Sequence, residues 1–123
     1  MNISSAEMQL LDILWSESPL TVGQIIQRAQ EKSDWHANTI KTMLTRLTNK
    51  GAVERKADGK RYFYSPGVTR NEIVKEETNG FLSRFFDGKV APLLAHFADN
   101  QKVSADELKE IEKILAKLKK NND

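Results

Sequence analysis

Apolar residues recur at helical spacing from the start of the chain, and polar residues separate the segments that they define. The first segment opens with Ser4-Ser5-Ala6-Glu7, a capping box in which Ser4 and Glu7 each bond a free backbone N–H. We expect a helix from this point to about Glu17, because Ser18-Pro19 resists its continuation. Its apolar positions are Met8, Leu11, Leu14 and Trp15.

A second capping box, Thr21-Val22-Gly23-Gln24, predicts a short second helix. Its apolar positions are Val22, Ile25, Ile26 and Ala29. We interpret both helices as scaffold, because apolar stripes of this kind usually face a core.

Residues 37–50 are predicted to form a third helix, which Gly51 ends in a left-handed conformation. One side of this helix is apolar and consists of Ile40, Met43, Leu44 and Leu47. The other side has no acidic residue and consists of Asn38, Thr42, Thr45 and Asn49, flanked by Thr39, Lys41 and Arg46. Because a solvent-exposed helix face usually mixes Glu with Lys, this face favours a partner made of phosphates and base edges.

Two β-prone runs follow, residues 52–56 and 61–65, joined across Ala57-Asp58-Gly59-Lys60. Asp-Gly between such runs predicts a hairpin, since both residues tolerate the positive φ of tight turns. Three helices and a hairpin are the order of a winged helix-turn-helix, with Lys56, Lys60 and Arg61 at or near the tip of the wing.

The charge is concentrated in the same segment. The net charge of +2 divides into −3 for residues 1–36, +5 for residues 37–65 and zero for the remainder. One short basic segment is the pattern expected when a single element binds a polyanion.

On this interpretation the third helix enters the major groove of double-stranded DNA, and its first turns contact bases. The predicted base contacts are Asn38, Thr39, Thr42 and Arg46. The predicted phosphate contacts are Lys41, Thr45, Lys60 and Arg61. Arg pairs with guanine, Asn with adenine, and a Thr methyl contacts the thymine methyl.

The pattern becomes helical again from Thr69 to a break at Asp87-Gly88, then in a shorter helix with Pro92 in its first turn. A last helix opens with Ser104-Ala105-Asp106-Glu107, and we expect fraying from Lys119 onward. Leu108, Ile111, Leu115 and Leu118 have the spacing of a short coiled-coil seam.

These three helices are too small to form a substantial core alone. They can fold back on the winged domain or pair with a second copy, and the apolar residues left over favour pairing. We therefore predict a mainly α protein with a winged helix-turn-helix DNA-binding domain at residues 1–67 and a helical dimerisation domain at residues 68–123. The candidate dimer contacts are Phe81, Phe85, Leu108, Ile111, Leu115 and Leu118.

Other classes find less support. The chain has no Cys and only two His, so we expect no metal and no cofactor. No apolar stretch approaches the roughly 20 residues of a membrane span, so a cytoplasmic protein without stable membrane association is expected. We expect no enzyme, because nucleotide, hydrolase and zinc-protease motifs are missing. A winged domain that binds protein, or a regulator that binds a small molecule beside Phe81, Phe85 and Phe86, remains an alternative.

Several of these motifs resemble the penicillinase and methicillin-resistance (BlaI/MecI) repressors, and the resemblance extends over nearly the whole chain. The specific part is the run Thr39-Ile40-Lys41-Thr42-Met43-Leu44-Thr45-Arg46-Leu47. The supporting parts are Ser4-Ser5-Ala6-Glu7, Leu14-Trp15, Lys32-Ser33-Asp34-Trp35, Lys50-Gly51 and Tyr62-Phe63-Tyr64-Ser65.

The resemblance implies a homodimeric repressor that binds a palindromic operator upstream of β-lactamase or penicillin-binding-protein genes. It also implies release by a membrane-bound sensor protease that cuts an Asn-Phe bond in the dimerisation domain. The corresponding bond here is His96-Phe97, in which the Phe is kept and the Asn is replaced. The copper-responsive branch of the family carries a cysteine-rich metal hook, which this chain lacks.

Overall fold

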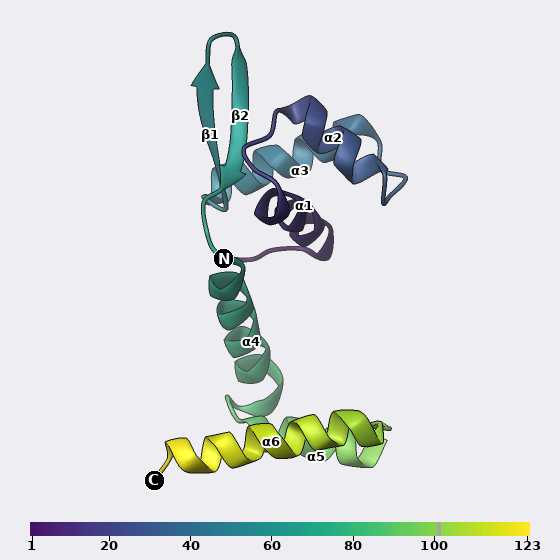
Figure 1. Cartoon of the computed structure of the whole chain (residues 1–123), viewed down its shortest axis with the longest axis vertical. Coiled ribbons are helices and arrows are strands. Elements are labelled where there is room, and N and C mark those ends of the chain that lie inside the picture. The colour runs from purple at the N-terminus through teal and green to yellow at the C-terminus, as the bar shows by residue number, and fades with distance from the viewer. Residues whose placement is uncertain (101) are drawn as a thin grey trace. The chain divides into compact units, whose positions relative to one another are not determined.

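The computed structural model describes residues 1–100 and 102–123, and its helices and one antiparallel hairpin are shown in Figure 1. The elements are α1 (Ser5–Ser16), α2 (Val22–Gln30), α3 (Ala37–Lys50), β1 (Val53–Asp58), β2 (Arg61–Pro66), α4 (Arg70–Phe86), α5 (Val90–Asn100) and α6 (Ala105–Asn121). The predicted order of three helices, a hairpin and three further helices is therefore confirmed.

The chain divides into two compact units, Met1–Asn79 and Gly80–Asp123, so that α4 contributes residues to both. The first unit contains the winged helix-turn-helix and the first turns of α4. The boundary expected after residue 67 is one between a DNA-binding domain and a dimerisation domain, and it stays a prediction.

The core of the first unit lies among α1, α2, α3 and the start of β1. Ser4 and Thr21 cap α1 and α2 through reciprocal capping boxes with Glu7 and Gln24, and Gly51 ends α3 at a φ of 84°. The four apolar positions predicted for α3 are all buried. The buried core residues are Leu10, Leu11, Leu14, Leu20, Ile25, Ala29, Ile40, Met43, Leu44, Leu47, Ala52 and Val53.

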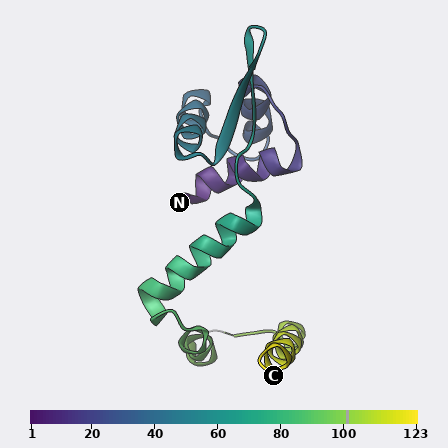
Figure 2. The ribbon, with the colours of Figure 1, turned by 90° about the vertical axis from the view of Figure 1, so that its left-hand side faces the viewer.

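The wing is longer and its turn is tighter than the sequence indicated. Ala57 and Asp58 belong to β1, and Asp58 pairs with Arg61, so that only Gly59 and Lys60 form the turn. The expected connection across four residues was wrong in this respect. Gly59 takes a φ of 65° at the first turn position, where glycine favours a two-residue turn and allows one more cross-strand pair. Figure 2 shows the tip of the hairpin extending beyond α1, α2 and α3.

The exit from the wing passes very close to the end of α3. Gly67 donates its N–H to the carbonyl of Ala52, and a Cβ at Gly67 would lie only 2.5 Å from the carbonyl oxygen of Gly51. At the next residue, the indole of Trp15 donates to the carbonyl of Val68 at 2.9 Å. The chain is thus fixed to α3 and α1 immediately before α4 begins.

The second unit has almost no core of its own. Asp87 and Gly88 end α4 with φ values of 56° and 77°, and Ser104 caps α6, which continues to Asn121 rather than fraying from Lys119. Neither α5 nor α6 contains a buried residue within the described part of the chain. Among residues 1–100 and 102–123, no helix has the length and apolar character of a membrane span.

Candidate nucleic-acid interface

The outer face of α3 is fully presented to solvent. All seven polar residues predicted for this face are exposed, and none of them is acidic; they are Asn38, Thr39, Lys41, Thr42, Thr45, Arg46 and Asn49. His36 precedes the helix, and its Nδ1 accepts the N–H of Asn38 at 3.2 Å. Because the His36 ring caps the first turn of α3, the backbone at the start of this face is held in place.

Two threonines of this face use their hydroxyl protons within the helix. Thr42 donates to the carbonyl of Asn38 at 2.9 Å, and Thr45 donates to the carbonyl of Lys41 at 3.0 Å. Each side chain therefore has its methyl group and an oxygen lone pair left for a partner. A thymine methyl group therefore suits Thr42 better than a hydrogen-bond acceptor does, because the Thr42 hydroxyl has no proton left to donate.

The wing brings a second group of cations together. Lys60 lies in the turn, and Arg61 begins β2 directly opposite Asp58. Arg55 was not predicted as a site residue, yet its guanidinium lies over the Tyr62 ring, 4.2 Å from the ring centroid. The alternation of residues along the strands places Arg55 and Tyr62 on the same face only when the register of the hairpin is known, so the sequence alone did not indicate this pair.

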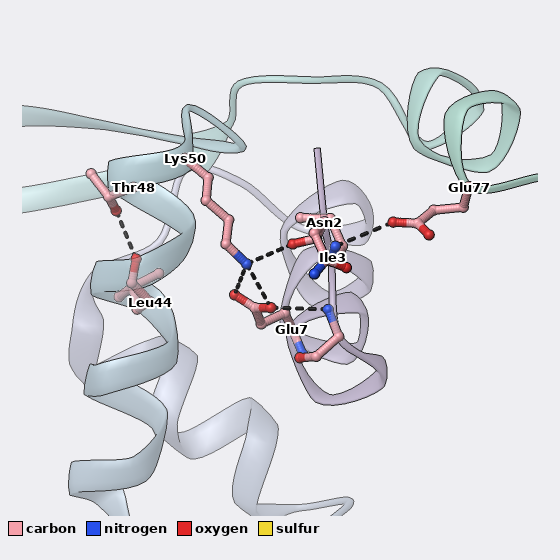
Figure 3. Close-up of polar contacts among 8 residues, drawn as sticks. Asn2, Ile3, Glu7, Leu44, Thr48, Lys50 and Glu77 are labelled. Atoms are coloured by element: carbon pink, nitrogen blue, oxygen red, sulfur yellow. Dashed lines mark hydrogen bonds and ion pairs between the residues drawn. The ribbon is translucent and has the colours of Figure 1, made fainter. Parts of the chain in front are cut away.

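Lys50 belongs to the basic segment but serves the fold instead of the exposed face. Its Nζ donates to both carboxylate oxygens of Glu7 at 2.9 Å and to the carbonyl of Asn2 at 2.6 Å, as Figure 3 shows. In the same view Ile3 donates its N–H to Glu77 at 3.2 Å. The end of α3, the start of α1 and the first turns of α4 are thus joined by one polar network.

Glu7 is the buried acid of this network, with only 5% of its surface exposed. Burial alone would raise the pKa of the Glu7 carboxyl. Hydrogen bonds from the Ser4 N–H, Lys50 and the Ser4 hydroxyl lower the pKa, as does the charge of Lys50, and their combined effect is larger than that of burial. The pKa of Glu7 is therefore below its ordinary value. The folded chain binds the proton of Glu7 more weakly than the unfolded chain does.

We expect Glu7→Gln to lower the free energy of unfolding by about 1 to 2 kcal/mol at neutral pH, because a charge-assisted bond to Lys50 is lost. The stabilisation by Glu7 is fully present above the pKa of the unfolded chain and is lost as pH falls through the lower pKa of the folded chain. The difference between wild type and Glu7→Gln should therefore shrink in acid. Denaturant unfolding at neutral and acidic pH measures it.

Glu54→Gln serves as the control, since the Glu54 side chain is exposed and its carboxylate has no ion pair among the described residues. A difference between wild type and Glu7→Gln that stayed constant from neutral to acidic pH would contradict this assignment.

The candidate dimer contacts are apolar and largely uncovered in the single chain. Phe81 and Phe85 are 45% and 60% exposed, with ring centroids 5.3 Å apart. On α6, Leu108, Leu115 and Leu118 are exposed and Ile111 is half-buried. Ile114, which was not predicted as a dimer contact, is also exposed and borders the same side of the helix. Its position extends the i, i+3 spacing from Ile111, a signal that was available.

The residues of the candidate cleavage bond are exposed on α5. His96 and Phe97 both lie at the surface of the single chain, with their rings in an edge-on arrangement. The bond between them lies within α5, and the side-chain amide of Asn100 donates to the carbonyl of His96 at 3.2 Å. Across the described residues, no group of three or more His, Asp or Glu side chains is arranged to hold a metal ion.

Three helices, a two-stranded wing and an exposed, acid-free face on the third helix define a winged helix-turn-helix protein of the DNA-binding class. Comparison with known proteins identifies it more closely. The family model described as "Penicillinase repressor" matches residues 3–117, and the chain belongs to this family. The family is one of transcriptional repressors, which are not a class of enzymes.

Individual relatives agree with this assignment. The chain is 30% identical to the penicillinase repressor of Bacillus licheniformis over 92% of this chain and 88% of that protein. It is 33% identical to the methicillin resistance regulatory protein MecI of Staphylococcus aureus over 94% of each. Among solved structures, monomeric Bacillus licheniformis BlaI in complex with the blaP half-operator matches with a TM-score of 0.53 and 30% identity, over 58% of this chain and 88% of that one.

Proposed function

We propose that the chain is a homodimeric repressor that binds a palindromic DNA operator, with one α3 in the major groove of each half-site. The observation that carries this proposal is the exposed face of α3, which combines hydrogen-bonding and cationic side chains and has no acid. A monomeric relative in complex with a half-operator supports one chain per half-site. A repressor of this kind would act in the cytoplasm, where its DNA lies.

We assign base contacts to the first three turns of α3, because the N-terminal part of the recognition helix contacts base edges in helix-turn-helix complexes. Arg46 donates bidentately to a guanine edge, Asn38 bonds an adenine edge, and Thr39 and Thr42 present methyl groups to thymine. Lys41, Lys60 and Arg61 bond phosphates and set the register of the protein on the duplex. Thr45 joins them when its hydroxyl proton turns from the Lys41 carbonyl to a phosphate oxygen.

Dimerisation through residues 68–123 is supported by their small core, since Ile73 and Leu82 are the only apolar residues buried there among those that the structure describes. Exposed apolar side chains of this number are stable in water only when a partner covers them. A second copy is the proposed partner, and a two-fold dimer is what a palindrome requires. The contacts assigned to it are Phe81, Phe85, Leu108, Ile111, Leu115 and Leu118.

Release of the repressor by a membrane sensor protease that cuts His96-Phe97 is part of the proposal. Both residues are exposed, but a protease needs an extended substrate, so α5 has to unwind locally before cleavage. A gene for such a sensor protease beside the gene for this chain would support this route, and its absence would count against it. Mass spectrometry of the chain after induction locates the cut.

The decisive variant for DNA reading is Arg46→Ala. Selection of bound fragments from a random library first defines the preferred site of the wild type. Arg46→Ala is then expected to lose about 1 to 3 kcal/mol of binding free energy on that site and to accept other bases at one position of each half-site. Titration against the preferred site and its single-base variants measures both effects.

Lys60→Ala is the control for this experiment, because a phosphate contact weakens all sequences alike and lowers the salt dependence. Equal affinity of wild type and Arg46→Ala for the preferred site would remove Arg46 from the reading face.

A further inference from the structure

The register of the hairpin places both of its acidic residues on one face of the wing. Alternate residues of a strand point to opposite faces, and directly paired residues share a face. One face therefore carries Val53, Arg55, Ala57, Tyr62, Tyr64 and Pro66, and the other carries Glu54, Lys56, Asp58, Arg61, Phe63 and Ser65. Both acids of the hairpin lie on the second face. The first, which we call the Arg55 face, has a cation and no acid.

Tyr62 holds the cation of the Arg55 face in place without neutralising it. The Arg55 guanidinium lies 4.2 Å from the centroid of the Tyr62 ring, and both side chains are exposed. Arg55 forms no ion pair with any residue that the structure describes. A cation stacked on an aromatic face keeps its charge and the N–H groups at its edge, so it stays available to an anion.

A hollow of about 550 Å³ lies beside this face, between β2 and the start of α2. Backbone bonds between Leu20 and Tyr64, of 3.0 and 2.8 Å, fix its two walls to each other. Its lining contains two cations, two tyrosines and no acid: Thr21, Val22, Gly23, Gln24, Gln27, Lys60, Arg61, Tyr62 and Tyr64. The lining therefore places hydrogen-bonding groups next to the Arg55 face, and none of its side chains would repel an anion.

We propose that the Arg55 face binds the phosphodiester backbone of DNA, with Arg55 as the charged contact and Tyr62 as its positioning residue. This inference rests on the proposed function and adds a contact that the sequence analysis did not assign. A phosphate backbone suits this surface because the Arg55 face offers a cation held in place by Tyr62, and the lining of the neighbouring hollow has no acidic residue to repel an anion. Lys56, one residue along β1, has the same charge but lies between Glu54 and Asp58 on the opposite face.

Arg55→Ala in the full chain tests the inference, with Lys56→Ala as its matched control. Dissociation constants are measured over a range of salt concentrations for the preferred duplex and for an unrelated duplex. Arg55→Ala is expected to weaken both duplexes roughly fivefold at physiological salt and to lower the slope of log K against log salt by about one, as for a single lost phosphate contact. Lys56→Ala is expected to change the slope by much less.

The role of Tyr62 is tested by a double-mutant cycle. Tyr62→Leu should weaken DNA binding when Arg55 is present and have no further effect in Arg55→Ala, whereas Tyr62→Phe, which keeps the ring, should bind like the wild type. Additive losses from Tyr62→Leu and Arg55→Ala would overturn the positioning role. Thermal unfolding checks that each variant is folded.

The outcomes separate this inference from the proposed function. Equal salt slopes for wild type and Arg55→Ala, or equal losses in Arg55→Ala and Lys56→Ala, overturn the inference while Arg46→Ala can still relax the base preference. Absence of DNA binding by the folded wild type overturns the proposed function itself.

Discussion

Leu115→Glu is expected to convert the proposed dimer into monomers and to weaken binding to the preferred operator by about 10² to 10⁴-fold, because two linked half-site contacts become independent. Leu115 is 41% exposed in the single chain and lies on the same side of α6 as Ile111 and Leu118. A carboxylate in the middle of this seam would be buried without a partner. The free energy needed to remove its charge from water exceeds the free energy gained by burying the apolar side chains of the seam. Sedimentation velocity and operator titration measure the two effects.

Ala116→Glu provides the matched control for this experiment. It adds the same charge at the neighbouring position, but one residue of helix turns it by about 100° away from the seam. It should therefore remain dimeric and bind the operator like the wild type. A Leu115→Glu variant that sedimented as a dimer would show that another surface holds the two copies together.

Gly67→Ala is expected to lower the free energy of unfolding by roughly 3 kcal/mol, the upper end of the range for an overpacked site. The added Cβ would lie 2.5 Å from the carbonyl oxygen of Gly51. Because that oxygen belongs to the backbone at the end of α3, it cannot rotate away as a side chain can. Strand and helix would have to separate, which also weakens the bond from the Gly67 N–H to Ala52. Denaturant unfolding measures the loss.

Gly23→Ala is the corresponding control, since a Cβ at Gly23 meets nothing closer than Thr21 Oγ1 at 4.0 Å. It lies in the first turn of α2, where alanine is favoured over glycine, so its stability should match or exceed that of the wild type. Similar losses in both variants would place the effect in the unfolded chain rather than in the contact with Gly51.

The local signals of the sequence predicted the N-terminal helices and the face of α3 well. Ser4 with Glu7 and Thr21 with Gln24 form the expected capping boxes, since both partners lie within one turn. The burial of Ile40 and its neighbours follows from the same helical periodicity that exposes Arg46. Such features depend on residues three or four positions apart, which a single sequence displays directly.

Features that depend on distant residues could not be predicted in this way. Lys50 looked like one more cation of the basic segment, but its partner Glu7 is 43 positions away. The turn of the wing was ambiguous because Asp58-Gly59 and Gly59-Lys60 both suit two-residue turns. The backbone bonds between Leu20 and Tyr64 join two segments that are far apart in the sequence, and only the folded chain reveals them.

The outer edge of β1 has a bearing on solubility. Within the described residues β1 pairs only with β2, so the backbone groups along its other edge are open to another strand. Glu54, Arg55 and Lys56 occupy the middle of this edge, and charged side chains discourage two copies from joining edge to edge. The residues that give the wing its charge also protect it from aggregation, and exchanging them for valine or threonine would remove that protection.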